Sequence, residues 1–438
     1  MDADDLDRRV RIMRGLVPTP LVLLLIERGH LDEVRRQAAR GQWFCAVEWA
    51  RTLGGRGDGD AALEVLRPFT DTGWWEAART AADLAQQWGR ESEALALVAP
   101  FAREGDPVAL GYTARLLARQ GRGDEGFAML RPHAGDPRLA RALVEVAAGL
   151  GRDDEVAALL EAALTRPDAP GDPAPLAAVY ERQGRIDAAE ALLRSTRTGV
   201  VSDVDALVDL LFRQGRHDDV RALVLGQAGS WAAHRLAGHL ERAGDVDGAA
   251  DVLRPFTGPV SWAALRPRVV LAQMLRRHGR ADECLDLLRP LPQLVVPDGE
   301  DTATVIEELG TLLNDQGRPE EALAVVDDLV RRDGGMSEEL FEQRVMLLCH
   351  AGRVGQALAE TRARAEAGEP DAPDTAWYLA SALERAGRYA EAIGVIREAG
   401  DAWWDKSVTA RLLLLQGRVR EAVDLLTQDP VPLGTGEA

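Results

Sequence analysis

The feature that most constrains this chain is a glycine that returns thirteen times, at spacings of 28 to 38 residues. Residues 121–132 read GRGDEGFAMLRP and residues 279–290 read GRADECLDLLRP, which are nearly the same twelve residues. A period of 20 to 50 residues held over most of a chain is typical of a solenoid or a repeat array. The repeat glycines are Gly29, Gly57, Gly89, Gly121, Gly151, Gly184, Gly215, Gly244, Gly279, Gly317, Gly352, Gly387 and Gly417.

The residues around each glycine predict a turn between two helices. Glycine suits the position just after a first helix, because the left-handed conformation needed there is cheap only for glycine. Arginine follows the glycine in ten of the thirteen copies, and an acid stands three residues after it in nine. Acids favour the amino terminus of a helix, so a second helix is expected to begin there.

Two columns of small residues predict where the two helices of a copy approach each other. Five residues after the glycine, every copy has Ala, Val, Gly or Cys, and seven residues before it, nine copies have Ala or Gly. The second helix is expected to stop at a proline eleven residues after the glycine in five copies. These prolines are Pro68, Pro100, Pro132, Pro255 and Pro290. Each copy is therefore predicted to be a helical hairpin that must stack on its neighbours, giving about 26 helices and no sheet.

These residues resemble the tetratricopeptide repeat family over roughly residues 16–428. The segment WYLASALERAGRYAEAIGVIREA (377–399) resembles it most, with Ala380, Gly387, Tyr389 and Ala392 at motif positions. The chain departs from the motif where Phe69, Phe101 and Phe256 replace its last alanine. The resemblance implies an all-α solenoid, a right-handed superhelix of about thirteen repeats, whose concave surface is lined by the first helices and binds proteins or peptides.

Proline-rich and glycine-rich loops divide the predicted array. We expect a tail or cap over residues 1–12, a solenoid of short repeats over 13–297, one of longer repeats over 298–428, and a disordered tail over 429–438.

Charge and composition exclude several classes of function. The formal net charge is −19, which disfavours binding to nucleic acid or to an anionic membrane surface. The apolar run at residues 21–26 is too short to span a bilayer, and the acidic amino terminus does not look like a signal peptide. Three scattered cysteines, Cys45, Cys284 and Cys349, form neither a disulfide framework nor a metal site. These features predict a cytoplasmic protein, and the preference for arginine over lysine indicates a bacterial genome rich in G and C.

The sequence offers no arrangement that predicts catalysis. GDAWWDKS (400–407) nearly matches a phosphate-binding loop, but Asp405 replaces its second glycine. The seven histidines lack metal-ligand spacing, and the adjacent Cys349 and His350 would point apart on a helix. We therefore expect no enzyme activity, no cofactor and no metal, although distant residues could still assemble an active site.

The resemblance places the candidate partner site on the exposed face of the first helices, 13, 10, 6, 3 and 2 residues before each glycine. We call these positions the first-helix face. In the central repeats it contains Arg79, Asp83, Arg115, Arg119, Arg138, Arg141, Glu145, Asp205, Asp209, His234, Arg266, Gln273 and Arg276.

Two interpretations of this face remain open. The basic stretch from Arg79 to Arg141 is either a set of solvated arginines paired with neighbouring acids, or a groove for an acidic peptide. Under the second interpretation, Arg115, Arg138 and Arg141 point into one cavity. The tryptophans likewise either pack between hairpins or serve as aromatic anchors for a partner.

The favoured hypothesis is a non-enzymatic scaffold or adaptor that binds a protein or peptide. The alternatives are a peptide-sensing regulator that acts through another protein and, third, an all-α enzyme.

Overall fold

The computed structural model describes residues 2–13, 15–165, 172–195, 201–225, 229–258, 262–293, 300–369, 375–399 and 403–427. Over these ranges the chain forms 27 α-helices and three short 3₁₀ helices, and no strand. The predicted all-α repeat fold is confirmed, and each of the thirteen repeat glycines joins the two helices of one hairpin. The helix beyond the expected 26 is α1 (Ala3–Arg11), which Asp2 caps and which buries Leu6.

The contacts within the chain divide it into two compact units. Unit 1 comprises residues 1–198 and 406–438, and unit 2 comprises residues 199–405. The helices of unit 1 after α1 are α2 (Thr19–Glu27), α3 (Leu31–Ala39), α4 (Trp43–Gly55), α5 (Gly59–Thr70), α6 (Trp75–Gln87), α7 (Glu91–Arg103), α8 (Pro107–Arg119), α9 (Gly123–Leu130), η1 (Arg131–His133), α10 (Pro137–Ala147), α11 (Asp153–Leu164), α12 (Ala174–Arg182), α13 (Ile186–Ser195), most of α26 (Trp403–Leu415) and α27 (Val419–Thr427).

Unit 2 contains the longer hairpins. Its helices are α14 (Val201–Arg213), α15 (His217–Val224), α16 (Gly229–Arg242), α17 (Val246–Leu253), η2 (Arg254–Thr257), α18 (Trp262–Arg277), α19 (Ala281–Leu288), η3 (Leu291–Gln293), α20 (Glu300–Asp315), α21 (Pro319–Asp333), α22 (Glu338–His350), α23 (Val354–Glu366), α24 (Thr375–Arg385) and α25 (Tyr389–Ala399). The predicted boundary near residue 297 falls within unit 2 and outside the described residues, and it stays a prediction. The predicted tail at 429–438 also lies outside them.

The repeat glycine makes the turn of every hairpin. All thirteen have φ between 67° and 86°, the left-handed region that other residues rarely adopt. At Gly279, the glycine N–H donates to the carbonyl of Arg276, and the Arg280 N–H donates to that of Leu275. These bonds satisfy carbonyls that the end of α18 would otherwise leave free.

The two predicted columns of small residues form the crossing point of each hairpin. All thirteen residues at each of the two columns are buried. In the fourth hairpin, a Cβ added to Gly126 would lie 2.6 Å from the carbonyl oxygen of Ala114. In the ninth, the Cys284 thiol donates to the carbonyl of Ala272, with 3.1 Å between Sγ and O. The backbones cross so closely here that only a small side chain fits.

The arginine after the glycine ties successive hairpins together. Arg280 pairs with Glu283 of its own second helix and with Asp247 of the preceding one, at 2.5 and 2.6 Å. Arg90 does the same with Glu93 and Asp60, at 2.6 and 2.5 Å. Corresponding bridges to the preceding hairpin join Arg152 to Asp124 and Arg353 to Glu320. The acid three residues after the glycine therefore receives the next arginine, as well as favouring the start of its own helix.

Two of the five predicted helix stops are wrong. Pro68 and Pro100 lie inside α5 and α7, which continue to Thr70 and Arg103. The next residue explains this, because Phe69 packs on the Trp43 ring at 5.1 Å between ring centroids and Phe101 packs on Trp75 at 5.3 Å. Burying these rings offsets the hydrogen bond that proline cannot make. The helices that precede Pro132, Pro255 and Pro290 do end as predicted, at Leu130, Leu253 and Leu288.

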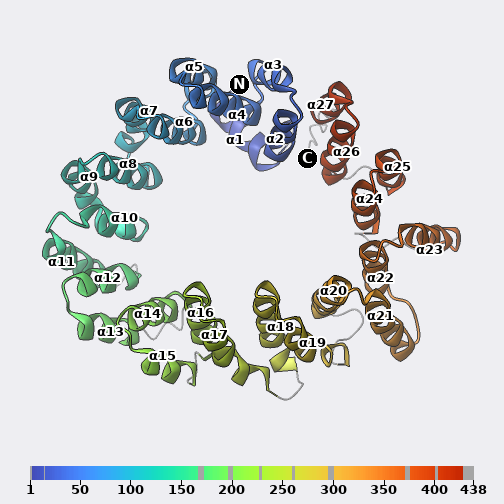
Figure 1. Ribbon diagram of the computed structural model, residues 1–438. Helices are drawn as coiled ribbons and strands as arrows, with labels where there is room; N and C mark the ends of the chain where they lie inside the picture. The colour runs from blue at the N-terminus through green and yellow to red at the C-terminus, as the bar shows by residue number, and fades with distance from the viewer. Residues whose placement is uncertain are drawn as a thin grey trace, which may run out of the picture. The chain divides into compact units, whose positions relative to one another are not determined.

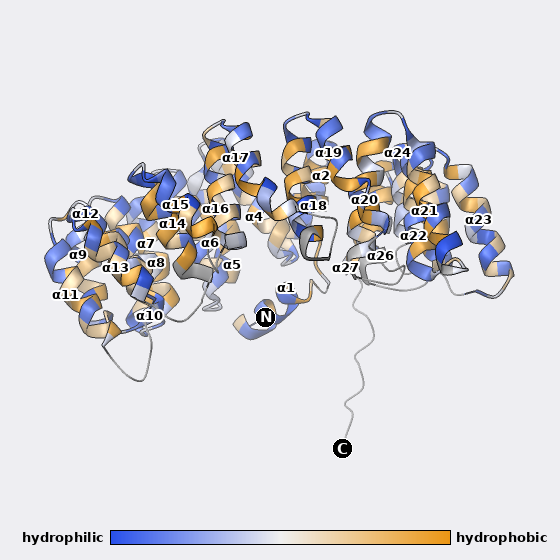
Figure 2. Ribbon diagram, turned by 90° about the horizontal axis from the view of Figure 1, so that it is seen from below, coloured by the Kyte–Doolittle hydropathy of each residue, from blue (hydrophilic) through white to orange (hydrophobic). Residues whose placement is uncertain are grey.

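Within each unit the hairpins stack as two layers, one of first helices and one of second helices (Figure 1). Many successive first helices pack on each other directly, as α8 does on α10 in unit 1 and α20 on α22 in unit 2. Successive second helices make at most slight contact, and each packs instead between its partner and the next first helix. Hydrophilic residues gather at the turns of α16–α17 and α18–α19 (Figure 2). The first helices therefore form the tighter layer. The side of this layer that the second helices do not cover is the one that the sequence predicts as the partner site.

Candidate partner-binding face

The structure places all thirteen predicted residues on the exposed or half-exposed surface of first helices, and none is buried. In unit 1 they lie on three consecutive first helices, α6, α8 and α10, and in unit 2 on α14, α16 and α18. The register taken from the glycines therefore identifies an accessible face.

In unit 1 the polar residues of this face are joined across helices. Arg79 pairs with Glu76 and with Asp83 on α6, and Asp83 accepts a 2.6 Å hydrogen bond from the Tyr112 hydroxyl on α8. Burial and the Asp83 carboxylate both raise the pKa of Tyr112, so its phenol stays protonated and donates. This network holds α6 and α8 in register.

Most arginines of the basic stretch are paired with acidic residues. Arg115 on α8 pairs with Glu145 on α10 at 2.5 Å, and Arg138 pairs with its neighbour Asp136 at 2.7 Å. Arg115 and Arg138 therefore have separate acidic partners, and the meeting of Arg115, Arg138 and Arg141 in one cavity stays a prediction. Pairing with neighbouring acids, the alternative interpretation, describes Arg79, Arg115 and Arg138.

Two arginines of this stretch lack a carboxylate partner among the described residues. Arg119 makes one long hydrogen bond, at 3.4 Å, to the side-chain oxygen of Gln86. Arg141 is exposed and has no ion pair within the described part of the chain. These two guanidinium groups are the ones that an acidic partner could engage without first breaking a salt bridge.

In unit 2 the face is organised around Asp209. Its carboxylate accepts hydrogen bonds from Arg235 and from His239 on α16, each at 2.6 Å, and the His239 ring stacks on Phe212 at 4.5 Å. Burial would raise the pKa of Asp209, but the bonds from Arg235 and His239 outweigh it and hold the pKa below its usual range.

The sequence prediction included Asp209 but not its partners. Asp209 and His239 are 30 residues apart, which is one repeat, so repeat spacing is the pattern that could have paired them.

The remaining predicted residues of unit 2 make smaller contacts. Gln273 and Arg276 on α18 both meet Glu308 on α20, at 2.6 and 3.5 Å. His234 bonds the carbonyl of Ser230 in its own helix.

Most of the exposed large apolar side chains stand at first-helix face positions. Six large hydrophobic residues of the described chain are exposed, and four of them occupy first-helix face positions. Counted from their glycines, Val108 and Trp231 stand at position −13, Trp377 at −10 and Leu23 at −6, with exposed fractions of 42 to 62%. The other two are Ile12, which precedes the repeats, and Leu225, at the end of a second helix. The five face positions are a minor part of each repeat, yet they hold four of these six exposed side chains, one on each of four separate first helices, α2, α8, α16 and α24.

Three tryptophans of unit 1 pack between hairpins. Trp43 and Trp74 are buried against each other at 4.9 Å between centroids, and Trp75 contacts Phe101 and Tyr112. Packing is therefore confirmed for these three, while Trp231 and Trp377 remain available as anchors. The side chains of Trp262, Trp403 and Trp404 lie outside what the structure describes.

None of the three cysteines is suited to nucleophilic catalysis. All three cysteines are free and buried, and burial raises the pKa of Cys45 to about 12 and of Cys284 and Cys349 to about 11. Such thiols stay protonated at neutral pH and are poor nucleophiles. No group of three metal-ligating side chains is found among the described residues, and none of their helices is long and apolar enough to cross a membrane.

Comparison with known families matches the tetratricopeptide repeat at four places, residues 174–195, 265–290, 308–328 and 406–428. These segments correspond to the hairpins α12–α13, α18–α19, α20–α21 and α26–α27. The predicted resemblance is thus confirmed. No curated protein matches the sequence.

Solved structures similar to this chain are helical-repeat proteins of low identity. Naa15/Naa10 bound to HypK-THB is 14% identical over 89% of this chain and 69% of that chain, with a TM-score of 0.33. The pentatricopeptide repeat protein PPR10 from maize is 14% identical over 93% and 71%, with a TM-score of 0.29. The Cut9–Hcn1 complex of the APC/C is 10% identical over 86% and 90%, with a TM-score of 0.28. At these scores the matches carry no argument about function.

Proposed function

We propose that this protein is a non-enzymatic scaffold that binds a protein or peptide on the first-helix face of its repeats. The observation that carries the proposal is the concentration of Leu23, Val108, Trp231 and Trp377 on that face. Large apolar side chains held in water are a cost that partner binding removes, at about 25 cal/mol for each Å² buried. Tryptophan is also among the residues that most often dominate interface energies.

The chemistry of the face describes the partner. Apolar anchors on it are accompanied by Arg119 and Arg141, which have no carboxylate partner among the described residues. A partner segment with apolar side chains flanked by acids would cover the apolar anchors and pair with the two arginines, since guanidinium groups bind carboxylates well. The net charge of −19 opposes binding of nucleic acid. The buried free cysteines suit a reducing compartment, so we place the protein in the cytoplasm.

The test compares proteins captured from host lysate by the wild-type chain and by face variants. Val108→Glu and Trp231→Ala remove exposed anchors without touching the core. Leu225→Ser is the matched control, because Leu225 is the most exposed of these residues, at 83%, but lies off the face. We expect both face variants to lose a partner that wild type and the Leu225→Ser control retain.

A second pair of variants addresses the acidic part of the partner. Arg119→Ala with Arg141→Ala should weaken the same capture, and more so at low salt, because screening already reduces exposed charge pairs at high salt. Equal recovery of every partner by wild type, face variants and control would contradict the proposal.

A further inference from the structure

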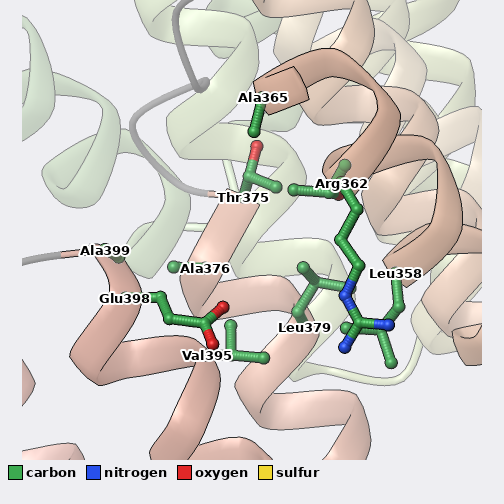
Figure 3. Close-up of a pocket in the computed structure, with 10 residues that line it drawn as sticks. Leu358, Arg362, Ala365, Thr375, Ala376, Leu379, Val395, Glu398 and Ala399 are labelled. Atoms are coloured by element: carbon green, nitrogen blue, oxygen red, sulfur yellow. The ribbon is translucent and has the colours of Figure 1, made fainter.

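A pocket of about 320 Å³ lies within unit 2, apart from the first-helix face, between α23, α24 and α25 (Figure 3). Its walls are largely apolar and come from all three helices. The lining residues used below are Leu358 and Arg362 on α23, Thr375 and Leu379 on α24, and Val395 and Glu398 on α25. The volume is in the range of small-molecule sites.

A buried hydroxyl at this pocket has no partner. Thr375 is 2% exposed, and its Oγ1 makes no hydrogen bond. An unsatisfied polar atom is unfavourable when buried, so native structures usually pair such atoms with protein, water or ligand. Thr375 is the first residue of α24, where the helix dipole also favours a negative group. This end of the pocket is therefore prepared for an anionic oxygen.

Two opposite charges border the same apolar surface. Figure 3 shows the guanidinium of Arg362 and the carboxylate of Glu398 on opposite sides of Leu379. Both residues are exposed, and neither has an ion pair within the described part of the chain. The Arg362 guanidinium helps to lower the pKa of Glu391 on α25. Glu398 lies in the last turn of α25, where the dipole adds to its negative charge.

We propose that this pocket binds a free α-amino acid with an aliphatic or aromatic side chain. Arg362 and the Thr375 hydroxyl would bind the carboxylate, Glu398 would bind the ammonium, and the side chain would pack on Leu358, Leu379 and Val395. An internal residue of a peptide carries neither charge and would engage neither Arg362 nor Glu398. A peptide end would satisfy one of them. The inference does not rest on the proposed partner face.

Calorimetric titration of the full chain tests this with leucine and phenylalanine as probes. We expect saturable binding of at least one of them. N-acetyl-leucine lacks the ammonium and leucinamide lacks the carboxylate. Each should bind tenfold to a hundredfold more weakly than leucine, on the order expected for the loss of one charge-assisted contact.

Variants assign the roles. Arg362→Met should weaken the binding of leucine more than that of leucinamide. Glu398→Gln should weaken the binding of leucine more than that of N-acetyl-leucine. Arg397→Met and Glu366→Gln are matched controls, since both residues are exposed on the same helices but do not line the pocket; they should bind leucine as wild type does.

Thr375→Val separates binding from folding. The valine removes a hydroxyl that has no partner in the unliganded chain, so the melting temperature should hold or rise while leucine affinity falls. A fall in melting temperature would show that the hydroxyl is satisfied in the free protein and would overturn its assignment. Absence of binding by both amino acids up to about 10 mM, where RT ln Kd is about −3 kcal/mol, or equal binding of N-acetyl-leucinamide and leucine, would overturn the proposal. The latter result would identify a peptide segment as the occupant.

Discussion

Unit 1 and unit 2 place their tryptophans differently. In unit 1, Trp43 and Trp74 are buried between hairpins, and Trp75 contacts Phe101 and Tyr112. In unit 2, Trp231 and Trp377 lie on the first-helix face with about half of their surface in water. The buried pair stands 14 and 15 residues before its glycines, whereas the exposed pair stands at 13 and 10. A shift of one residue turns a helical side chain by about 100°, which is enough to separate the exposed Trp231, at 13, from the buried Trp43, at 14. This shift does not describe Trp74, which precedes α6 as its N-cap residue, or Trp377, which is four residues out of register with Trp43.

The comparison teaches that a tryptophan either packs in the core or stays exposed for a partner, depending on its position relative to the repeat glycine. Both prolines inside helices, Pro68 and Pro100, are followed by a phenylalanine whose ring contacts a tryptophan, whereas Phe256 follows Pro255 and α17 still ends at Leu253. Where no such aromatic stack is seen, after Pro132 and Pro290, the α-helix ends before the proline.

The largest effect is expected for Trp43→Ala. This change removes ring contacts to both Phe69 and Trp74 and leaves a cavity, at a cost of about 3–5 kcal/mol in unfolding free energy. Hydrogen exchange should show the loss in α4, α5 and α6, because each hairpin depends chiefly on its neighbours. Unchanged exchange in these helices would mean that the aromatic stack does not stabilise them.

Phe101→Ala should have the next largest effect, about 2–3 kcal/mol, since the ring is only partly buried. Without the ring contact to Trp75, we expect α7 to end before Pro100. The Glu104 amide, which donates to the Pro100 carbonyl at 3.2 Å, would then exchange quickly. Persistent protection of that amide would show that something other than the aromatic contact carries the helix through proline.

Ala249→Trp tests the hairpin crossing in unit 2. Ala249 is fully buried five residues after its glycine, so the larger ring should overpack α16 against α17 and cost about 1–3 kcal/mol or more. Limited proteolysis should then cut near this hairpin first. Uniform cleavage along the chain would show that the assigned helix faces are wrong.

Asp209→Asn should cost about 1 kcal/mol at neutral pH, because it weakens charge-assisted bonds from Arg235 and His239. The folded pKa of Asp209 lies below its ordinary value, so its contribution is complete above about pH 4 and disappears as the pH falls through the folded pKa. Thermal melts of wild type and variant should therefore differ at pH 7 and converge as the pH falls below the folded pKa. A constant difference at all pH values would exclude the carboxylate charge as the cause.

The smallest effect is expected for Trp231→Ala, the counterpart of Trp43→Ala. With 55% of the ring already exposed, we expect a change within about 0.5 kcal/mol. A loss comparable to that of Trp43→Ala would mean that Trp231 is structural, and the contrast between the two units would fail.

The hairpins could be predicted from sequence because local chemistry decides them. A glycine such as Gly279 is needed for the left-handed turn, and small residues such as Ala272 and Cys284 are needed where backbones cross. These requirements recur in every copy, so thirteen weak patterns support one another. The exposure of the first-helix face followed from the same register.

What sequence could not provide was the choice of partner for each side chain. Arg115 has several acids within one repeat of it, and only the packing of α8 on α10 selects Glu145. The pairing of Asp209 with His239 likewise depends on how α14 meets α16. Pro100 does not end its helix as predicted, because Phe101 contacts Trp75, and this ring contact depends on tertiary packing rather than on local sequence.

The most direct test of the central claim, that the first-helix face is the partner surface, is photo-cross-linking in the host. A photoreactive phenylalanine analogue would replace Val108, Trp231 or Leu225 in three separate variants, and cross-linked proteins would be identified by mass spectrometry. The account predicts discrete adducts from Val108 and Trp231 and none of them from Leu225, which is the most exposed of the three but lies off the face. Adducts from Leu225 alone, or the same adducts in equal yield from all three positions, would contradict it.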